Sequence, residues 1–255
     1  MRIATWNING IRAAVRKGMG DHLERVSPDV VLLQEVRATP DKIPAEWREP
    51  ASWHAHWHPA ERPGYAGTGV LSRHAVKVEE RGAGEPDPEG RVIMSRIEGV
   101  RLASVYLPSG SSGEHRQAEK DRWLKFFLEW SSKLARSRIP TILGGDFNIA
   151  HTPSDIFYAK SNEKNSGFLP HERAWVTELL DQGWADLIRE KFGDVQGPYS
   201  WWSNRGQARA LDRGWRIDYL FANKAAAKLV TDCHIDRSSG MEVSDHAMVI
   251  ADLDV

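Results

Sequence analysis

The segment 144–148 reads Gly-Gly-Asp-Phe-Asn and directly follows the apolar run Ile-Pro-Thr-Ile-Leu at 139–143. A buried strand that ends here would present a carboxylate, Asp146, and an amide, Asn148, on the same side because side chains alternate along a strand. The two glycines would allow a close backbone approach. The combination suits a phosphate and a hydrolytic water, although Asp and Asn are also common in ordinary turns.

Similar side chains stand at the ends of other predicted strands. They are Asn7 and Asn9, Gln34 and Glu35, Tyr106, Asp218, and Asp245 with His246. A hydrophobic core does not need polar residues at six strand ends, whereas ligand sites collect at such edges of a sheet. The pattern therefore favours a functional site.

The residue types are consistent with phosphate ester hydrolysis. Carboxylates such as Glu35 and Asp245 are suitable ligands for magnesium or manganese. An Asp beside a His can orient the imidazole and stabilise its cation. Asn side chains and the Tyr106 hydroxyl can hold phosphate oxygens without adding negative charge.

Strands and helices alternate along the chain that must position these residues. Apolar or alternating runs predict strands at 3–8, 29–34, 53–58, 68–72, 91–97, 101–106, 141–145, 217–221, 229–235 and 246–253. Helical spacing predicts helices at 115–134, 172–180 and 185–191, and residues 82–90 read as a loop. This mixture predicts a layered α/β or α+β fold. Because no linker or repeat is visible, we expect a single domain over residues 1–255.

Composition narrows the class of protein. The 255 residues are 41% hydrophobic and 27% charged, which is typical of a soluble protein with a substantial core. The single cysteine, Cys233, excludes an intramolecular disulfide and fits a reducing compartment, and we interpret it as a small buried hydrophobe. Residues 1–6 run directly into a predicted strand without an apolar leader, and no transmembrane stretch follows. We expect a cytoplasmic protein, nucleoid-associated if bacterial, with no membrane partner.

The net charge of −1 gives no global positive field, so phosphate must be bound by local basic patches. We interpret the segment 116–125 as a solvated face. The segment 205–216 combines tryptophan with Arg205, Arg209, Arg213 and Arg216, which favours contact with nucleic acid. The alternating histidines 54, 56 and 58 are interpreted as a polar sheet face, with Trp53, Ala55 and Trp57 in the core.

The motifs together resemble the exonuclease III family of AP endonucleases, within the endonuclease/exonuclease/phosphatase group. The resemblance includes Trp6-Asn-Ile-Asn-Gly-Ile-Arg12, Gly145-Asp-Phe-Asn-Ile-Ala-His151 and Gly214-Trp-Arg-Ile-Asp-Tyr219. Further matches occur in order at 33–35, 64–67, 106–108, 162–168, 201–203 and 244–246. It implies a four-layered α/β sandwich of two mixed sheets packed face to face, with helices outside.

The same resemblance implies an enzyme that cuts DNA 5′ to an abasic site and leaves a 3′-hydroxyl and a 5′-deoxyribose phosphate. It also implies 3′-to-5′ exonuclease and 3′-end-trimming activity, a Mg²⁺ cofactor that Mn²⁺ can replace, and action as a monomer. The expected partner is double-stranded DNA that contains abasic sites or blocked 3′ ends. Two alternatives remain open. The first is another phosphoesterase on the same scaffold, such as a nonspecific DNase or an inositol-phosphate or lipid phosphatase, and the second is a DNA-binding module without catalysis.

Roles follow for the matched residues. The implied catalytic residues are Tyr106, Asp146, Asn148, Asp218 and His246. The implied metal-associated residues are Asn7, Glu35, Asp146, Asn148, Asp245 and His246. The implied DNA contacts are Tyr65, Asn162, Asn165, Trp201 and Trp215, the two tryptophans as walls of an abasic-sugar pocket. The chain departs from the family pattern at Arg37, where lysine is usual, and in the segment 108–113, which lacks arginine.

Overall fold

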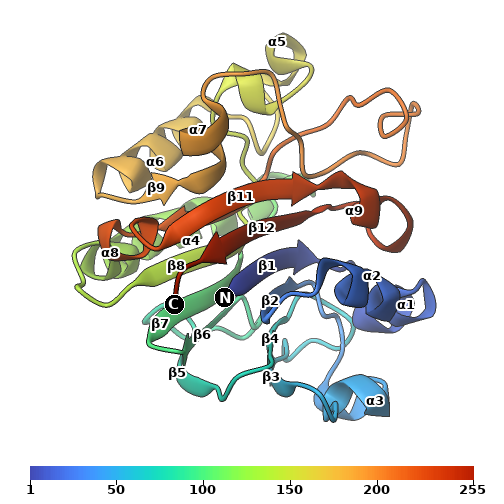
Figure 1. Cartoon of the computed structure of the whole chain (residues 1–255). Helices are drawn as coiled ribbons and strands as arrows, with labels where there is room; N and C mark the ends of the chain where they lie inside the picture. Colours follow the sequence, from blue (N-terminus) through green and yellow to red (C-terminus); the bar gives the residue numbers. More distant parts are fainter.

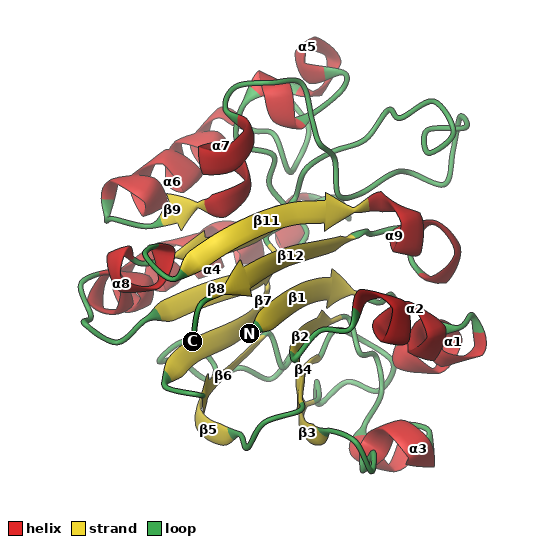
Figure 2. Cartoon of the chain, viewed as in Figure 1, coloured by secondary structure: helices red, strands yellow, loops and turns green.

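Two six-stranded sheets lie face to face, and helices cover their outer sides (Figure 1 and Figure 2). The computed structural model describes residues 1–238 and 242–255 in full. The first sheet has the strand order β11-β12-β1-β2-β4-β3, and the second has the order β5-β6-β7-β8-β10-β9. Each sheet contains one parallel pair, β1 with β2 and β7 with β8, among antiparallel neighbours. The four-layered α/β sandwich of mixed sheets is confirmed.

The strands of the first sheet are β1 (Arg2–Asn7), β2 (Val30–Gln34), β3 (His54–His58), β4 (Thr68–Ser72), β11 (Val230–Asp236) and β12 (Met248–Leu253). Those of the second are β5 (Lys77–Arg81), β6 (Val92–Ile97), β7 (Val100–Tyr106), β8 (Thr141–Asp146), β9 (Ala185–Asp186) and β10 (Asp218–Ala222). The α-helices are α1 (Ile11–Arg16), α2 (Met19–Val26), α3 (Ala45–Arg48), α4 (Glu114–Ala135), α5 (Ala159–Asn162), α6 (Pro170–Asp181), α7 (Leu187–Phe192), α8 (Lys224–Ala227) and α9 (Arg237–Val243).

Three apolar clusters separate the four layers. The central cluster fills the space between the sheets and includes Val30 and Leu32 of β2. The alternate residues Val31 and Leu33 pack on the other side of the same strand, among residues of α1 and α2. The third cluster lies between the second sheet and the helices α4 and α6. Strand β2 is buried on both faces, which explains why its sequence is a continuous apolar run.

Most predicted elements are present, and the differences have local causes. All ten predicted strands occur, with small shifts at their ends, and residues 82–90 form a loop. The helix predicted at 185–191 is wrong in its first two residues, which form β9. The helix begins at Leu187 because the Asp186 side chain caps it by accepting a hydrogen bond from the Arg189 amide. The sequence did not predict the short helices α1, α2, α3, α5, α8 and α9 or the edge strand β5, whose residues are mostly charged.

Several interpretations of single residues hold. Trp53, Ala55 and Trp57 pack against the outer apolar cluster of the first sheet. Cys233 is buried in the central cluster, and burial raises the pKa of its thiol to about 11. Within the described part of the chain, no helix is long and apolar enough to cross a membrane.

A buried ionic network fixes the start of β10. The guanidinium of Arg216 donates to Asp155 at 2.6 Å and to Asp186 at 3.1 Å, and its backbone amide donates to the Asp155 carbonyl at 2.7 Å. Arg189 donates to the same Asp155 carboxylate at 3.0 Å. The assignment of Arg216 to a nucleic-acid-binding patch is therefore wrong, because its side chain is fully buried between two carboxylates. The network holds the backbone two residues before Asp218.

We expect Asp155→Asn to destabilise the fold by about 3–5 kcal/mol, because it removes a counter-charge from the fully buried Arg216 guanidinium and from the partly exposed Arg189 guanidinium. Burial alone would raise the pKa of the Asp155 carboxyl, but Arg216 and Arg189 lower it to about 2. A lowered pKa means that the stabilisation is complete above the unfolded pKa of 3.8 and is lost as the pH falls toward 2. Urea unfolding of both proteins between neutral and acidic pH measures this difference. The exposed Asp254→Asn serves as control, and equal stability of wild type and Asp155→Asn at neutral pH would contradict the assignment.

Candidate functional site

A pocket of about 680 Å³ lies where strands of both sheets end. The predicted site residues that line it are Glu35, Tyr106, Asp146, Asn148, Asn162, Asn165, Trp201, Trp215, Asp245 and His246. Asn7 and Asp218 are almost fully buried and contact these residues from beneath. Tyr65 is not part of the lining. The structure thus brings all but one of the predicted residues to a single place.

Strand register places three of the polar side chains side by side. Tyr106 on β7 pairs with Asp146 on β8, and Asp146 pairs with Asp218 on β10. Residues paired across neighbouring strands point to the same face of a sheet. This face is the one toward the first sheet, because Asn7 at the end of β1 reaches Asp146. The site therefore lies between the two sheets, at one edge of the sandwich.

The amide of Asn7 joins carboxylates from opposite sheets. Its Nδ2 donates to Glu35 Oε1 at 3.0 Å and to Asp146 Oδ2 at 2.9 Å. Its Oδ1 accepts a hydrogen bond from the Asn9 amide at 3.0 Å, which fixes the orientation of the side chain. Glu35 Oε1 also accepts from the Tyr106 hydroxyl at 2.7 Å, and the other oxygen pairs with Arg37. Both carboxylates are thus positioned by donors that carry no negative charge.

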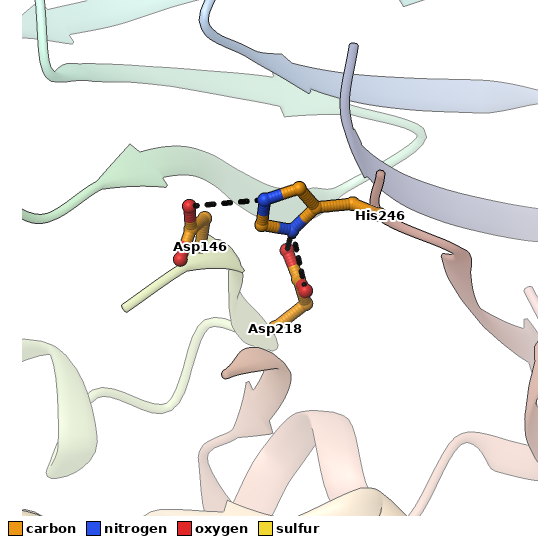
Figure 3. Close-up of side chains that lie close together, drawn as sticks. All are labelled: Asp146, Asp218 and His246. Atoms are coloured by element: carbon orange, nitrogen blue, oxygen red, sulfur yellow. Dashed lines mark hydrogen bonds and ion pairs between the residues drawn. The ribbon is translucent and has the colours of Figure 1, made fainter. Parts of the chain in front are cut away.

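Asp218 and His246 form a buried pair in front of Asp146 (Figure 3). The imidazole Nδ1 lies 2.9 Å from Asp218 Oδ2 and 3.1 Å from Oδ1. The hydroxyl of Ser200 donates to the same carboxylate at 2.6 Å and accepts from the backbone amide of Asp218 at 3.1 Å. The other nitrogen, Nε2, faces Asp146 Oδ2 at 3.9 Å. The pair thus directs a ring N–H toward the pocket.

The electrostatics follow from burial and close charges. Burial alone would lower the pKa of His246, but Asp218, with Asp146 and Asp245, raises it to about 10. Burial raises the pKa of Asp146 to about 7. The negative charges of Asp218 and Glu35 also raise this pKa, whereas the positive charge of His246 lowers it. Burial also raises the pKa of Tyr106 well above its usual value. At neutral pH, His246 and Tyr106 are therefore hydrogen-bond donors. Asp146, with a pKa of about 7, can accept a proton at this pH.

Asn148 reaches the pocket by a different route from the one predicted. Strand β8 ends at Asp146, and Asn148 has a left-handed backbone with φ of 52°, so the two-residue alternation does not extend to it. Its amide N donates to Asp146 Oδ1 at 2.9 Å, and its Nδ2 donates to the Leu107 carbonyl at 2.9 Å. This turn, and not strand geometry, places the two side chains together. Glu35 has a similar left-handed backbone, with φ of 50°.

The predicted DNA contacts lie mainly at the rim. Trp201 and Trp215 form a backbone bridge, and their ring centroids are 6.1 Å apart at an angle of 83°. Trp201 Nε1 donates to Asp245 Oδ2 at 3.1 Å. Asn165 Nδ2 donates a hydrogen bond to Asn162 Oδ1 at 2.8 Å, and both residues line the pocket. The Tyr65 hydroxyl instead accepts from Arg116 and Arg91 outside the pocket.

A buried lysine was missed by the sequence interpretation. Lys120 lies in the segment 116–125 predicted as a solvated face, but it is fully buried, and its Nζ lies 2.6 Å from Glu172. It also donates to the Asn148 carbonyl at 2.9 Å, while Glu172 accepts from the Gly167 amide at 2.7 Å. The pair therefore ties Asn148 to the segment that carries Asn162 and Asn165. The signal was available: Lys120 lies three residues before the core residue Trp123, on the same helix face.

The donor set suits a hard divalent cation. Asp146, Asp218 and His246 offer ligand atoms within 4.8 Å of one another. Carboxylate oxygens of Glu35 and Asp245 border the same pocket and are the donors that Mg²⁺ and Mn²⁺ prefer. His246 is less suited as a ligand, because a metal binds the neutral imidazole and Asp218 favours its cation.

Comparisons with known proteins show which family the chain resembles over its whole length. The model of the Endonuclease/Exonuclease/phosphatase family matches residues 4–246. An exodeoxyribonuclease of Bacillus subtilis is 34% identical over 252 residues, which are 98% of each chain. The structure of an AP endonuclease from Archaeoglobus fulgidus superposes over 100% of both chains, with a TM-score of 0.89 and 25% identity. A Neisseria 3′ phosphatase bound to a product DNA hairpin also covers 100% of both chains, with a TM-score of 0.89 and 29% identity.

We expect Asp218→Asn to lower the pKa of His246, because the substitution removes the charge that favours the imidazolium. Any stability from the raised pKa is complete below the unfolded value of 6.5 and is lost as the pH rises through about 10. NMR titration of the His246 ring nitrogens in both proteins measures the shift. The ring of exposed His54 is the internal control, and an unchanged His246 pKa would show that the two residues are not coupled.

Proposed function

Because this chain belongs to the Endonuclease/Exonuclease/phosphatase family, we propose that it is a DNA-repair AP endonuclease. It hydrolyses the phosphodiester bond 5′ to an abasic site and leaves a 3′-hydroxyl and a 5′-deoxyribose phosphate. It also has 3′-to-5′ exonuclease and 3′-end-trimming activity. One observation carries the proposal: Asp146 and the Asp218–His246 pair form the floor of a pocket that Trp201 and Trp215 border. The names of the exodeoxyribonuclease and AP endonuclease relatives support it.

Asp146 is the group that acts on the attacking water. Its Oδ2 is held by Asn7 Nδ2 and its Oδ1 by the Asn148 amide, so the carboxylate cannot rotate away from the pocket. The raised pKa of Asp146, about 7, suits a residue that accepts a proton near neutral pH. Water held there attacks phosphorus in line with the leaving 3′ oxygen of the preceding nucleotide.

His246 and Tyr106 stabilise the phosphate as its charge grows. Asp218 keeps the imidazolium charged and turns its Nε2–H toward the pocket. The Tyr106 hydroxyl stays protonated, because burial raises its pKa well above the usual value, and its single hydrogen turns from Glu35 Oε1 to a phosphate oxygen when the substrate binds. Donors that the fold orients in advance stabilise the transition state without reorganisation of solvent. Asn148, which also lines the pocket, lies within the same group of polar contacts.

The acidic residues at the pocket fit Mg²⁺, with Mn²⁺ as an alternative. Glu35 is the principal ligand in this proposal, with Asn7 and Asp245 nearby. When bound, the cation supplies positive charge that offsets the charge of the phosphate oxygens. Arg37, which pairs with Glu35 through its guanidinium, keeps the free carboxylate from being an isolated charge.

The tryptophans select the lesion. An abasic sugar is easier to extrude from the duplex than a complete nucleotide, because it has no base to unstack. The hydrogen bond from Trp201 Nε1 to Asp245 fixes the Trp201 ring, and the Trp215 ring packs edge-to-face against the Trp201 ring. These two walls of the pocket therefore have a defined shape. A nonspecific DNase or a small-molecule phosphatase does not require two such rings, and a binding module without catalysis does not require Asp146 and His246.

The direct test is incision of a labelled abasic duplex beside an intact duplex of the same sequence. We expect Mg²⁺-dependent cleavage of the abasic strand, with product ends that carry a 3′-hydroxyl. Asp146→Asn should reduce turnover by roughly 10²–10⁴-fold while duplex binding survives, since the lost interaction belongs to the transition state. Asp181→Asn, an exposed change, is the matched control. Equal cleavage of both duplexes by the wild type would refute the abasic specificity.

Glu35→Gln should raise the Mg²⁺ concentration required for half-maximal activity, because the amide keeps the shape and removes the charge that attracts the cation. Calorimetric titration with Mn²⁺ provides a second readout that does not depend on turnover. Glu46→Gln on the exposed surface of α3 controls for charge. Identical metal titrations for Glu35→Gln and the wild type would remove Glu35 from the ligand set.

Trp215→Ala should lower incision at abasic sites more than cleavage of intact DNA, because it enlarges the pocket that rejects a complete nucleotide. If Trp215 were merely core, the change would cost about 3–5 kcal/mol and lower both activities together. The measurement is therefore the ratio of the two cleavage rates together with the melting temperature. Trp130→Ala, a half-buried tryptophan on α4, gives the effect of truncation away from the site. An unaltered ratio with a large drop in melting temperature would assign Trp215 to packing.

A further inference from the structure

A second hollow, of about 860 Å³, lies at the other end of the sandwich. It is bordered by the carboxyl-terminal ends of α4 and α6 and by α8. Strand β8 begins at Thr141 and β10 ends at Ala222, whereas the candidate active site contains Asp146 and Asp218 from their opposite ends. At about 3.3 Å per residue, the two sites are roughly 15–20 Å apart. Figure 1 shows α8 on the left of the molecule and the carboxyl end of β1 on the right.

The floor of this hollow is apolar. Trp184, Ala135, Ala185 and Ala227 contribute to its lining. Trp184 is only 3% exposed, and its indole Nε1–H has no hydrogen-bond partner among the described residues. A concave apolar surface rimmed by polar residues is typical of a binding site.

The rim is strongly cationic. Arg136, Arg138, Lys224 and Lys228 line the hollow with exposed side chains, and Glu190 is the acidic residue among the described lining. None of these four cations makes an ion pair or side-chain hydrogen bond in the part of the chain that the structure describes. The chain as a whole has a net charge of −1, so four unpaired cations around one hollow are a local excess. Such an excess attracts an anionic partner.

We propose that this hollow is a docking site for an acidic peptide segment of a partner protein. An apolar side chain of the segment rests on the floor near Trp184, and flanking carboxylates face the four cations. A nucleic acid backbone fits less well, because it supplies phosphates without an apolar anchor for an alanine and tryptophan floor. The hollow also lies away from the pocket that would hold the scissile phosphate. The proposal does not depend on the reaction proposed above.

A short fluorescein-labelled peptide of aspartates that ends in phenylalanine is the probe, and fluorescence anisotropy at about 0.15 M salt, where weak surface electrostatics are screened, is the measurement. We expect saturable binding that weakens when the phenylalanine is replaced by serine or the aspartates by asparagines. Arg138→Glu combined with Lys224→Glu should weaken it by at least about tenfold, because attraction becomes repulsion. Lys42→Glu combined with Lys77→Glu, at exposed residues that do not line the hollow, makes the same change in net charge and should leave binding unchanged.

A second variant separates the hollow from its charge. Ala225→Trp places a bulky ring in the lining and leaves all four cations, so it should also reduce peptide binding. If the tryptophan variant fails to fold, Ala225→Leu fills the hollow with a smaller side chain. Phosphodiester cleavage should be unchanged in every variant, which also reports on folding. Peptide binding that is insensitive to both the charge reversal and the filled hollow overturns the proposal. Tighter binding of a single-stranded oligonucleotide, lost in the same variants, also overturns it and assigns the surface to nucleic acid.

Discussion

The site depends on one buried amide that holds carboxylates from two sheets at hydrogen-bond distance. Asn7 donates to Glu35 in its own sheet and to Asp146 in the other, while the Asn9 backbone fixes its oxygen. Without a neutral donor between them, two carboxylates so close would repel each other. An aspartate at this position would add a third charge, and an apolar residue would remove one hydrogen-bond donor from each carboxylate. The amide is therefore the residue type that lets the sheets close over an acidic site.

The carboxylates around this amide differ in the positive charges that lie beside them. Glu35 is balanced by Arg37, and Asp218 is balanced by His246. Asp146 lies between these pairs, deeply buried and with the weakest compensation, which explains why its pKa is raised. Asp245 differs, because burial is outweighed by His246, Trp201 and Asn9, and its pKa is lowered. The fold thus keeps the Asp146 carboxyl near its titration point and favours the ionised form of Asp245.

The sequence predicted the chemistry of the site better than its geometry. Apolar runs that end in polar residues identified the strand ends, since burial imposes that pattern directly on the sequence. Asn148 shows the limit: its position comes from a turn that its own amide makes with Asp146, which no periodicity encodes. Arg216 and Lys120 show another limit. The number of charges along the chain does not reveal that each of these cations forms an ion pair with a buried carboxylate in the folded protein. The sequence did not predict the short helices α1 and α2, because helices of so few turns give only a weak periodic pattern of apolar residues.

The catalytic and specificity elements differ in how they are supported. Tyr106, Asp146 and Asp218 sit in register on three neighbouring strands, so their spacing is set by the sheet itself. The tryptophan wall and the segment with Asn162 and Asn165 belong to connections between strands, and buried pairs tie them back to the core: Arg216 with Asp155 for the first, and Lys120 with Glu172 for the second. Each pair lies away from the pocket surface, yet each anchors a segment that reaches it. Substrate preference can therefore change through these connections while the hydrolytic group on the strands stays as it is.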